Sequence, residues 1–193
     1  MNYYLINCDR SLNDAVIIDA VPENGPKGYV YKKLKPLSKL FPATAKVYFS
    51  SNYSSGIKLY DFVDNTLGVL IVSEAAKKVI SETQKKYIEF LPVLMFDHKK
   101  SQVEGVKYFI LNYFHDVDFV DKDNSNVVMN SINKETIFEI KGDVCIKKQN
   151  IPDDAHIFRA KNWPNQYVIS ETLENKIKEA GLSGYELQNT HCK

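Results

Sequence analysis

The sequence predicts an α+β fold made mostly of antiparallel sheets with a few helices. Expected strands outnumber expected helices along the 193 residues. The two clear helices are too far apart for the regular alternation of strand and helix that builds a parallel sheet. Each helix also lies between two expected strands, and the two strand–helix–strand units resemble each other. These three observations favour an α+β arrangement over a doubly wound sheet.

The clearer unit lies in the segment NQYVISETLENKIKEAGLSGYEL. Ser170 is the expected helix N-cap, and Glu171 places a carboxylate at the positive end of the helix dipole. The apolar positions at helical spacing are Leu173, Ile177 and Ala180. Gly181 follows as a residue that tolerates positive φ, and Leu182 is placed to pack on the last turn, which predicts a Schellman ending. A strand resumes at Tyr185.

The same pattern occurs earlier in the chain, in LIVSEAAKKVISETQKKYIEF, where the apolar helix positions are Ala76, Ile80 and Thr83. The corresponding pairs are Ser73–Glu74 with Ser170–Glu171, Glu89–Phe90 with Glu186–Leu187, and Tyr3–Asn7 with Tyr108–Asn112. The separation of the copies is well beyond the roughly 20 to 50 residues of a solenoid repeat. We interpret the likeness as duplication of one α+β unit, which gives two related halves; chance recurrence of a common pattern is the alternative.

The rest of the chain reads mainly as short strands separated by polar turns. In the N-terminal half the expected strands are Tyr3–Cys8, Ala15–Ile18, Val47–Phe49, Ile57–Phe62 and Tyr87–Phe96. The last of these is apolar on both faces, so we expect it inside a sheet. In the C-terminal half they are Val106–Phe114, a hairpin of Thr136–Ile140 with Val144–Lys147, and His156–Arg159. A polar, acidic loop, Asp116–Asn126, follows the first of these strands.

Length and composition predict one compact domain, 1–193, and the duplication leaves open a division into two lobes, 1–97 and 98–193. With 44% hydrophobic residues, the chain can bury a core without disulfides or a metal. Its 25 basic and 24 acidic residues give a net charge of +1, which argues against a general attraction to nucleic acid or to a membrane. No signal-peptide or membrane-spanning pattern is present, and three scattered cysteines favour reduced thiols, so we expect a cytoplasmic protein.

Residue patterns for catalysis or metal binding are weak, and we expect no enzymatic activity, cofactor or metal. The segment Asp121–Asn126 resembles the start of a calcium loop, but asparagine and isoleucine stand at the sixth and twelfth positions, where glycine and glutamate are required. Cys145 with His115 or His156 is a candidate nucleophile and base. Cys145 lies in an apolar strand, however, where a buried and inert thiol is usual.

A small basic cluster comes early in the chain, between apolar residues. Its lysines are Lys32, Lys33, Lys35 and Lys39. Such a cluster suggests contact with RNA or phosphate, while a solvated face over a buried aromatic edge is the alternative. We favour the solvated face, because the chain as a whole is not basic.

Several segments of the second half resemble a known bacterial family in their order along the chain. They are YFILNYFHDVDFVD from Tyr108 to Asp121, IPDDAHIFR from Ile151 to Arg159, Trp163–Pro164, and VISETLENKIKEAGLSGYEL up to Leu187. The first half matches through Tyr3–Leu5 and Val72–Glu74. This pattern is similar to that of the Myxococcus-type immunity proteins of polymorphic toxin systems, a family formerly described as a domain of unknown function. In that family a smaller aromatic residue is usual where this chain has Trp163.

The resemblance implies a non-catalytic protein that binds and neutralises a cognate toxin encoded by an adjacent gene. Such a protein needs a rigid scaffold and a surface complementary to the toxin. The candidate partner-binding residues are Asp116, Asp118, Asp121, Asp123 and Trp163. An acidic turn and a core tryptophan are the ordinary alternatives for them. A small-ligand or hydrolytic domain with a pocket between the two halves is the competing function, and the oligomeric state is left open.

Overall fold

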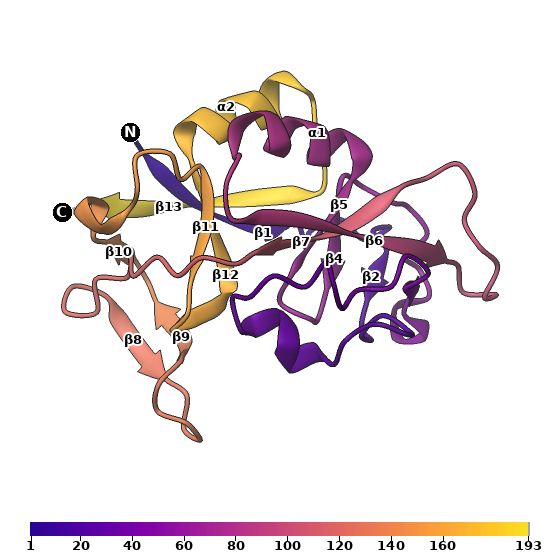
Figure 1. Cartoon of the computed structure of the whole chain (residues 1–193), viewed down its shortest axis with the longest axis horizontal. Coiled ribbons are helices and arrows are strands. Elements are labelled where there is room, and N and C mark those ends of the chain that lie inside the picture. The colour runs from indigo at the N-terminus through magenta and orange to yellow at the C-terminus, as the bar shows by residue number, and fades with distance from the viewer. Residues whose placement is uncertain (193) are drawn as a thin grey trace.

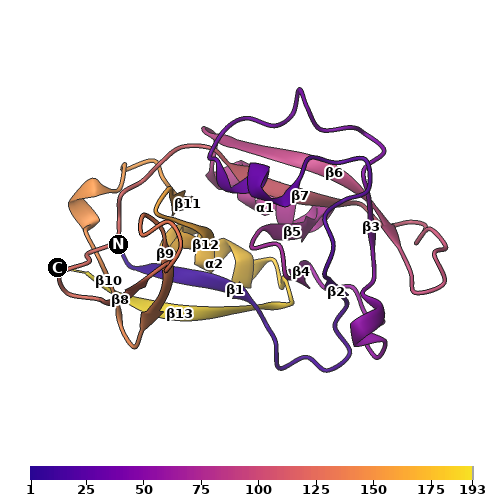
Figure 2. The ribbon, with the colours of Figure 1, turned by 90° about the horizontal axis from the view of Figure 1, so that it is seen from below.

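Two large sheets and two helices make up the body of the protein (Figures 1 and 2). The computed structural model describes residues 1–192, with Cys192 described by its backbone alone. The five-stranded sheet has the order β10 (Val144–Ile146), β13 (Tyr185–Cys192), β1 (Tyr3–Cys8), β12 (Trp163–Ser170) and β11 (Ile157–Ala160). The six-stranded sheet has the order β2 (Ile17–Ile18), β4 (Phe62–Asn65), β5 (Leu70–Ser73), β7 (Tyr108–Tyr113), β6 (Ile88–Phe96) and β3 (Lys46–Tyr48).

The smaller elements complete the architecture. Strands β8 (Asn126–Met129) and β9 (Ile137–Lys141) form a separate antiparallel hairpin. The helices are α1 (Glu74–Thr83) and α2 (Glu171–Glu179), with short 3-10 helices η1 (Gly28–Lys32), η2 (Ser51–Tyr53) and η3 (Lys148–Asn150). Most strand pairs are antiparallel, and the pairs β10–β13, β2–β4 and β3–β6 at the sheet margins are parallel. The predicted α+β class with mainly antiparallel sheets is therefore confirmed. In the described residues no helix is long and apolar enough to cross a membrane.

Helix α2 begins and ends as its sequence predicts. The Ser170 Oγ accepts a hydrogen bond from the Leu173 amide at 3.3 Å, the expected N-cap. At the other end Gly181 has φ +64°, and its amide bonds the Lys178 carbonyl oxygen at 2.9 Å. The Leu182 amide reaches the Ile177 carbonyl oxygen at 3.2 Å. These two bonds define a Schellman motif, which requires the left-handed conformation that glycine adopts without strain.

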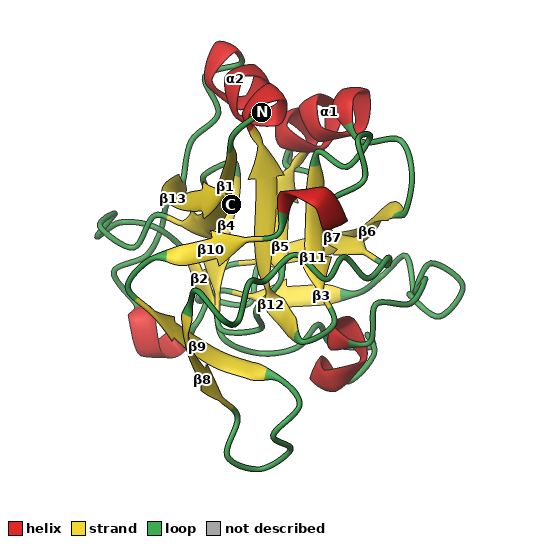
Figure 3. Cartoon of the chain, turned by 90° about the vertical axis from the view of Figure 1, so that its left-hand side faces the viewer, coloured by secondary structure: helices red, strands yellow, loops and turns green. Residues whose placement is uncertain are grey.

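Both helices lie side by side over one face of the sheets (Figure 3). Ser73 caps α1 by accepting the Ala76 amide at 3.1 Å. This helix has no terminal glycine. Its C-cap residue is Gln84, which is buried and whose Oε1 accepts the backbone amides of His156 at 2.7 Å and Ile157 at 3.2 Å. One glutamine side chain thus connects the end of α1 to the start of β11 by hydrogen bonds. The local sequence of the helix does not predict this contact.

The two strand–helix–strand units have the same strand register. Ser73 at the end of β5 lies opposite Tyr108 of β7, and Ser170 at the end of β12 lies opposite Tyr3 of β1. The Cα partners further along are Leu111 with Phe90 and Ile6 with Leu187. The strand that joins each unit into its sheet follows the first unit in sequence but precedes the second. An origin by duplication, and a division of the chain into lobes, stay predictions.

Two predicted strand assignments are wrong. The segments Thr136–Ile140 and Val144–Lys147 do not form a hairpin: β9 pairs with β8, and β10 pairs in parallel with β13. The reason is burial, because all three residues of β10 are buried and extend the five-stranded sheet. The predicted strand Ile57–Phe62 begins only at its last residue and continues to Asn65. Ile57 itself is 72% exposed and so contributes little to the core.

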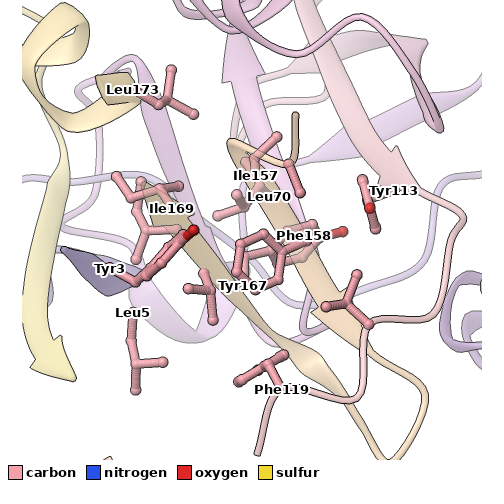
Figure 4. Close-up of a cluster of buried hydrophobic side chains, with 14 of the residues drawn as sticks. Tyr3, Leu5, Leu70, Tyr113, Phe119, Ile157, Phe158, Tyr167, Ile169 and Leu173 are labelled. Carbon is pink, nitrogen blue, oxygen red and sulfur yellow. The ribbon is translucent and has the colours of Figure 1, made fainter. Parts of the chain in front are cut away.

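The hydrophobic core forms two clusters that share the six-stranded sheet. Alternate residues of β5 enter different clusters: Leu70 and Val72 face the helices, and Ile71 faces the opposite side. The larger cluster joins that sheet to the five-stranded one, and Figure 4 shows Tyr3, Phe158 and Tyr167 packed together in it. Strands of the six-stranded sheet are therefore buried on both faces, between the two core clusters.

Candidate partner-binding surface

The hairpin β8–β9 projects from the body on the side away from the helices (Figure 3). It pairs with neither large sheet. Ile137 is buried, and its amide bonds the Asn162 carbonyl oxygen at 2.6 Å, while Val127, Met129 and Ile140 also pack against the core. Phe138 on β9 is 72% exposed, and Ile132 in the connecting loop is 91% exposed. Exposed apolar side chains on a projecting hairpin are a common feature of protein–protein contact sites.

A cavity of about 470 Å³ lies between this hairpin and the predicted acidic loop. We call it the acidic cavity. Its lining residues are Asp116, Asp118, Lys122, Glu135, Thr136, Lys161 and Asn162. Three carboxylates against two amines leave a local excess of negative charge. The cavity therefore presents acceptors to a cationic group of a partner.

The four predicted aspartates divide into two pairs. Asp116 and Asp118 line the acidic cavity, where the Asp116 Oδ1 accepts the Lys161 backbone amide at 2.7 Å. Asp121 instead turns inward, is only 7% exposed, and accepts the side-chain amide of Asn124 at 2.6 Å. This hydrogen bond is the main cause that lowers the pKa of Asp121 below its ordinary value. Asp123 is exposed outside the cavity, so only the first pair shares a site.

Trp163, the other predicted contact residue, lies at the start of β12 and is 8% exposed. Its ring lies 6.5 Å from that of Phe119, which in turn packs edge-on against Phe158 at 5.5 Å between centroids. The indole is thus part of the core, and it does not line the acidic cavity.

A second hollow, of about 670 Å³, lies between the hairpin and the segment around η1, and we call it the basic groove. Its lining residues are Tyr29, Lys32, Lys33, Lys35, Asn130, Asn133, Thr136, Ile137, Phe138, Lys161, Pro164 and Asn165. Three of the four lysines of the early basic cluster are among them, and Lys39 is not. Thr136 and Lys161 line both hollows, so the acidic cavity and the basic groove are neighbours.

A buried arginine contacts the lining of the basic groove from inside the protein. Arg159 is fully buried, and its guanidinium donates to the carbonyl oxygens of Tyr113 at 3.0 Å and Pro164 at 3.2 Å. It also donates to the Asn112 Oδ1 at 2.7 Å. The guanidinium therefore makes three hydrogen bonds, as a charge in a protein interior requires.

The network continues from Asn112 to the wall of the groove. The Asn112 Nδ2 donates to the Glu89 carboxylate at 2.7 Å and to the Lys35 carbonyl oxygen at 2.9 Å. Glu89 also accepts the backbone amides of Leu37 and, at 3.1 Å, Ser38. The sequence reasoning missed this network; an arginine inside the apolar run of residues 157–160 was the available signal. Because the strand is buried on both sides, that arginine had to be hydrogen-bonded inside the protein.

The residues considered for catalysis are not brought together by these contacts. Cys145 is buried, and its backbone amide donates to the Ser125 Oγ at 3.0 Å. The His115 ring instead stacks on Tyr87 with 4.3 Å between centroids. Burial raises the pKa of the Cys8 thiol to about 12, far from that of a reactive thiolate. Among the described residues, no group of three or more His, Cys, Asp or Glu side chains is arranged to hold a metal ion.

Comparison with known proteins identifies the family. A search of curated proteins finds no match. A family model described as the immunity protein family Imm11 matches residues 2–191. That match covers nearly the whole chain and confirms the resemblance to immunity proteins seen in the sequence. The chain therefore belongs to the Imm11 immunity protein family.

Proposed function

We propose that this protein protects its producing cell by binding and neutralising a cognate toxin, without catalysing a reaction. Its membership of an immunity protein family over residues 2–191 is the observation that carries this proposal. The toxin is the product of an adjacent gene, and the two proteins meet in the cytoplasm. Neutralisation then depends on how strongly and where the two proteins bind.

The acidic cavity and the hairpin β8–β9 form the contact surface in this proposal. Asp116 and Asp118 are exposed and stand at the cavity, where they pair with basic groups that a toxin uses to bind its substrate. Phe138 supplies exposed apolar area beside them. Asp121 holds the loop in shape through Asn124, Asp123 extends the negative charge outward, and Trp163 contributes to the rigid core rather than to the contact itself.

Co-expression with the adjacent gene tests the proposal. Wild-type protein is expected to restore growth to cells that express the toxin, and to co-purify with it. The double variant Asp116→Asn, Asp118→Asn is expected to bind about tenfold more weakly, because each change removes a charge but keeps the size of the side chain. Glu82→Gln on α1 is the control, since it removes an exposed carboxylate at the opposite end of the molecule.

The outcomes distinguish the immunity function from the proposed contact surface. If the wild-type protein neither rescues growth nor binds the toxin, the immunity function is refuted. Rescue by wild type with equal affinity for the double variant and the Glu82→Gln control would keep the function but remove the acidic cavity from the contact surface. Protein stability is measured for each variant, so that a folding defect is not read as weaker binding.

A further inference from the structure

We propose that the basic groove binds an extended acidic segment of the toxin, as a second contact beside the acidic cavity. The identity of the partner rests on the proposed immunity function. The chemistry of the ligand, a segment rich in aspartate and glutamate, rests on the groove alone. The two can therefore fail separately.

The charge of the groove is the first support. Lys32, Lys33, Lys35 and Lys161 line it, and no carboxylate does. Among the described residues, none of these four amines takes part in an ion pair, whereas lysines elsewhere do, such as Lys107 with Glu74 at 3.0 Å. The whole chain carries a net charge of only +1, so this is a local excess that faces solvent. Carboxylates of a partner are its natural complement.

The groove is also held in shape before any ligand arrives. Its lysine-bearing wall is fixed at Lys35 and Leu37 by the hydrogen bonds of Asn112 and Glu89. Leu37 is buried, which adds an apolar anchor to the same wall. Further along, the Lys33 amine lies 4.8 Å from the centre of the Tyr29 ring. A wall fixed in this way costs little conformational entropy when a ligand binds.

Exposed aromatic rings give the groove its apolar contact area. Tyr29 is 58% exposed on the wall formed by η1, and Phe138 is 72% exposed on the hairpin. Aromatic rings with nearby cations also bind nucleic acid, which is the competing ligand. A protein segment is favoured because the chain as a whole has almost no net charge to draw in a polyanion, and because the proposed function is to bind a protein.

The position of the groove agrees with a single partner that occupies both hollows. Lys161 and Thr136 belong to both, so a toxin whose surface alternates in charge can place a cation against Asp116 and a carboxylate against Lys161. Opposite charges on neighbouring sites fix the orientation of a complex as well as its strength.

The test is charge reversal with a matched control. The groove variant is Lys32→Glu, Lys33→Glu, Lys35→Glu; the control is Lys78→Glu, Lys85→Glu, Lys99→Glu, which changes the net charge equally at exposed sites outside the groove. Binding of the adjacent-gene toxin is measured at two salt concentrations. We expect the groove variant to bind at least about tenfold more weakly at low salt, with a smaller salt dependence, and the control to bind within about twofold of wild type. Equal losses in both variants would overturn the proposal.

A second probe separates this proposal from the immunity function. A fluorescent hexaglutamate peptide and a single-stranded oligonucleotide of matched charge are titrated into the wild-type chain and both variants. Peptide binding that is lost only in the groove variant supports the basic groove as a site for acidic segments, even if the toxin does not bind. No peptide binding to wild type, or preference for the oligonucleotide, overturns the proposal. Thermal unfolding of the variants confirms that they are folded.

Discussion

The two strand–helix–strand units place the same pair of polar residues at the same register, but in different surroundings. Asn112 faces Glu89 in the first unit, and Asn7 faces Glu186 in the second. The first pair is enclosed by Arg159 and by the chain at Lys35–Ser38. In the second pair Glu186 is exposed.

The second pair, Asn7 and Glu186, is the open pair, and its hydrogen bonding is weaker. The Asn7 Oδ1 accepts from the Gln166 side chain at 3.3 Å, and the pair lines a cavity of about 320 Å³ together with Arg10 and Asp64. The Arg10 side chain is 76% exposed and lies 3.6 Å from the Asp64 carboxylate. The same position in the scaffold therefore does not by itself make a polar pair important for stability. What covers the pair decides it, and in the first unit the cover is the wall of the basic groove.

Removing the buried arginine is expected to have the largest effect on stability. Arg159→Met keeps most of the volume but leaves the Asn112 Oδ1 and two buried carbonyl oxygens without their donor, at a cost of about 3 kcal/mol. Arg10→Met is the matched change near the open pair, and it is expected to cost less than about 0.5 kcal/mol. Urea unfolding of both variants measures the difference. Equal losses of stability in the two variants would show that the enclosed pair is no more important for stability than the exposed one.

Neutralising each glutamate separates the enclosed pair from the exposed pair. Glu89→Gln removes the charge that accepts the Leu37 and Ser38 amides and the Asn112 side chain, and we expect a loss of about 1 to 2 kcal/mol. Glu186→Gln is expected to change stability by less than about 0.5 kcal/mol, because the side chain is exposed. If Glu186→Gln proves the more damaging change, the enclosed pair is not the structural one. Glu89→Gln should also weaken toxin binding by loosening the groove wall.

The N-caps of the two helices have different hydrogen-bond partners, so we expect them to respond differently to pH. This effect on stability is the smallest that we predict. The Ser73 hydroxyl donates to Asp61 at 2.6 Å, whereas the Ser170 Oγ lies 2.8 Å from the His156 Nδ1. Burial, followed by the nearby Lys176 charge, lowers the pKa of His156 below 6.5. The unfolded chain then binds the proton more readily than the folded one does. The contribution of His156 to stability is complete above pH 6.5 and is lost as the pH falls toward the lowered value.

Stability curves between pH 5 and 8 check this difference. The His156→Gln variant should lose less stability than wild type as the pH falls below 6.5, because glutamine does not titrate there. The variant Ser73→Ala removes the other cap without touching the histidine, and its pH profile should parallel that of wild type. A wild-type profile that is flat over this range, or one that His156→Gln leaves unchanged, would contradict the proposed contribution of His156 to stability.

Local sequence patterns predicted the elements whose determinants are local. The N-cap at Ser170 and the glycine ending at Gly181 depend on neighbouring residues, and both were found. The partners of β9 and β10 depend instead on which sheet each strand reaches, and their closeness in sequence did not make them a hairpin. Two predicted contact residues, Asp116 and Asp118, line one cavity. Trp163 lies in the core, as a single large apolar ring usually does.

The basic groove could not be predicted, because its walls come from distant segments. The lysines of residues 32–35 and the exposed Phe138 meet only when the hairpin β8–β9 folds against the body. The buried network that fixes one wall likewise joins Glu89, Asn112 and Arg159 from three different strands. The sequence predicted a solvated face for the lysines, and only the tertiary structure shows that they share one groove with Phe138.

Hydrogen–deuterium exchange of the chain with and without the adjacent-gene toxin reports where a partner covers the backbone, and so tests both the proposed function and the proposed surface. We expect slower exchange in the toxin complex over residues 116–141, which hold the acidic loop and the hairpin, and over residues 28–35 of the groove wall. Helices α1 and α2 should exchange as they do in the free protein. Protection confined to the helices, or no protection at saturating toxin, would contradict the proposed surface and function.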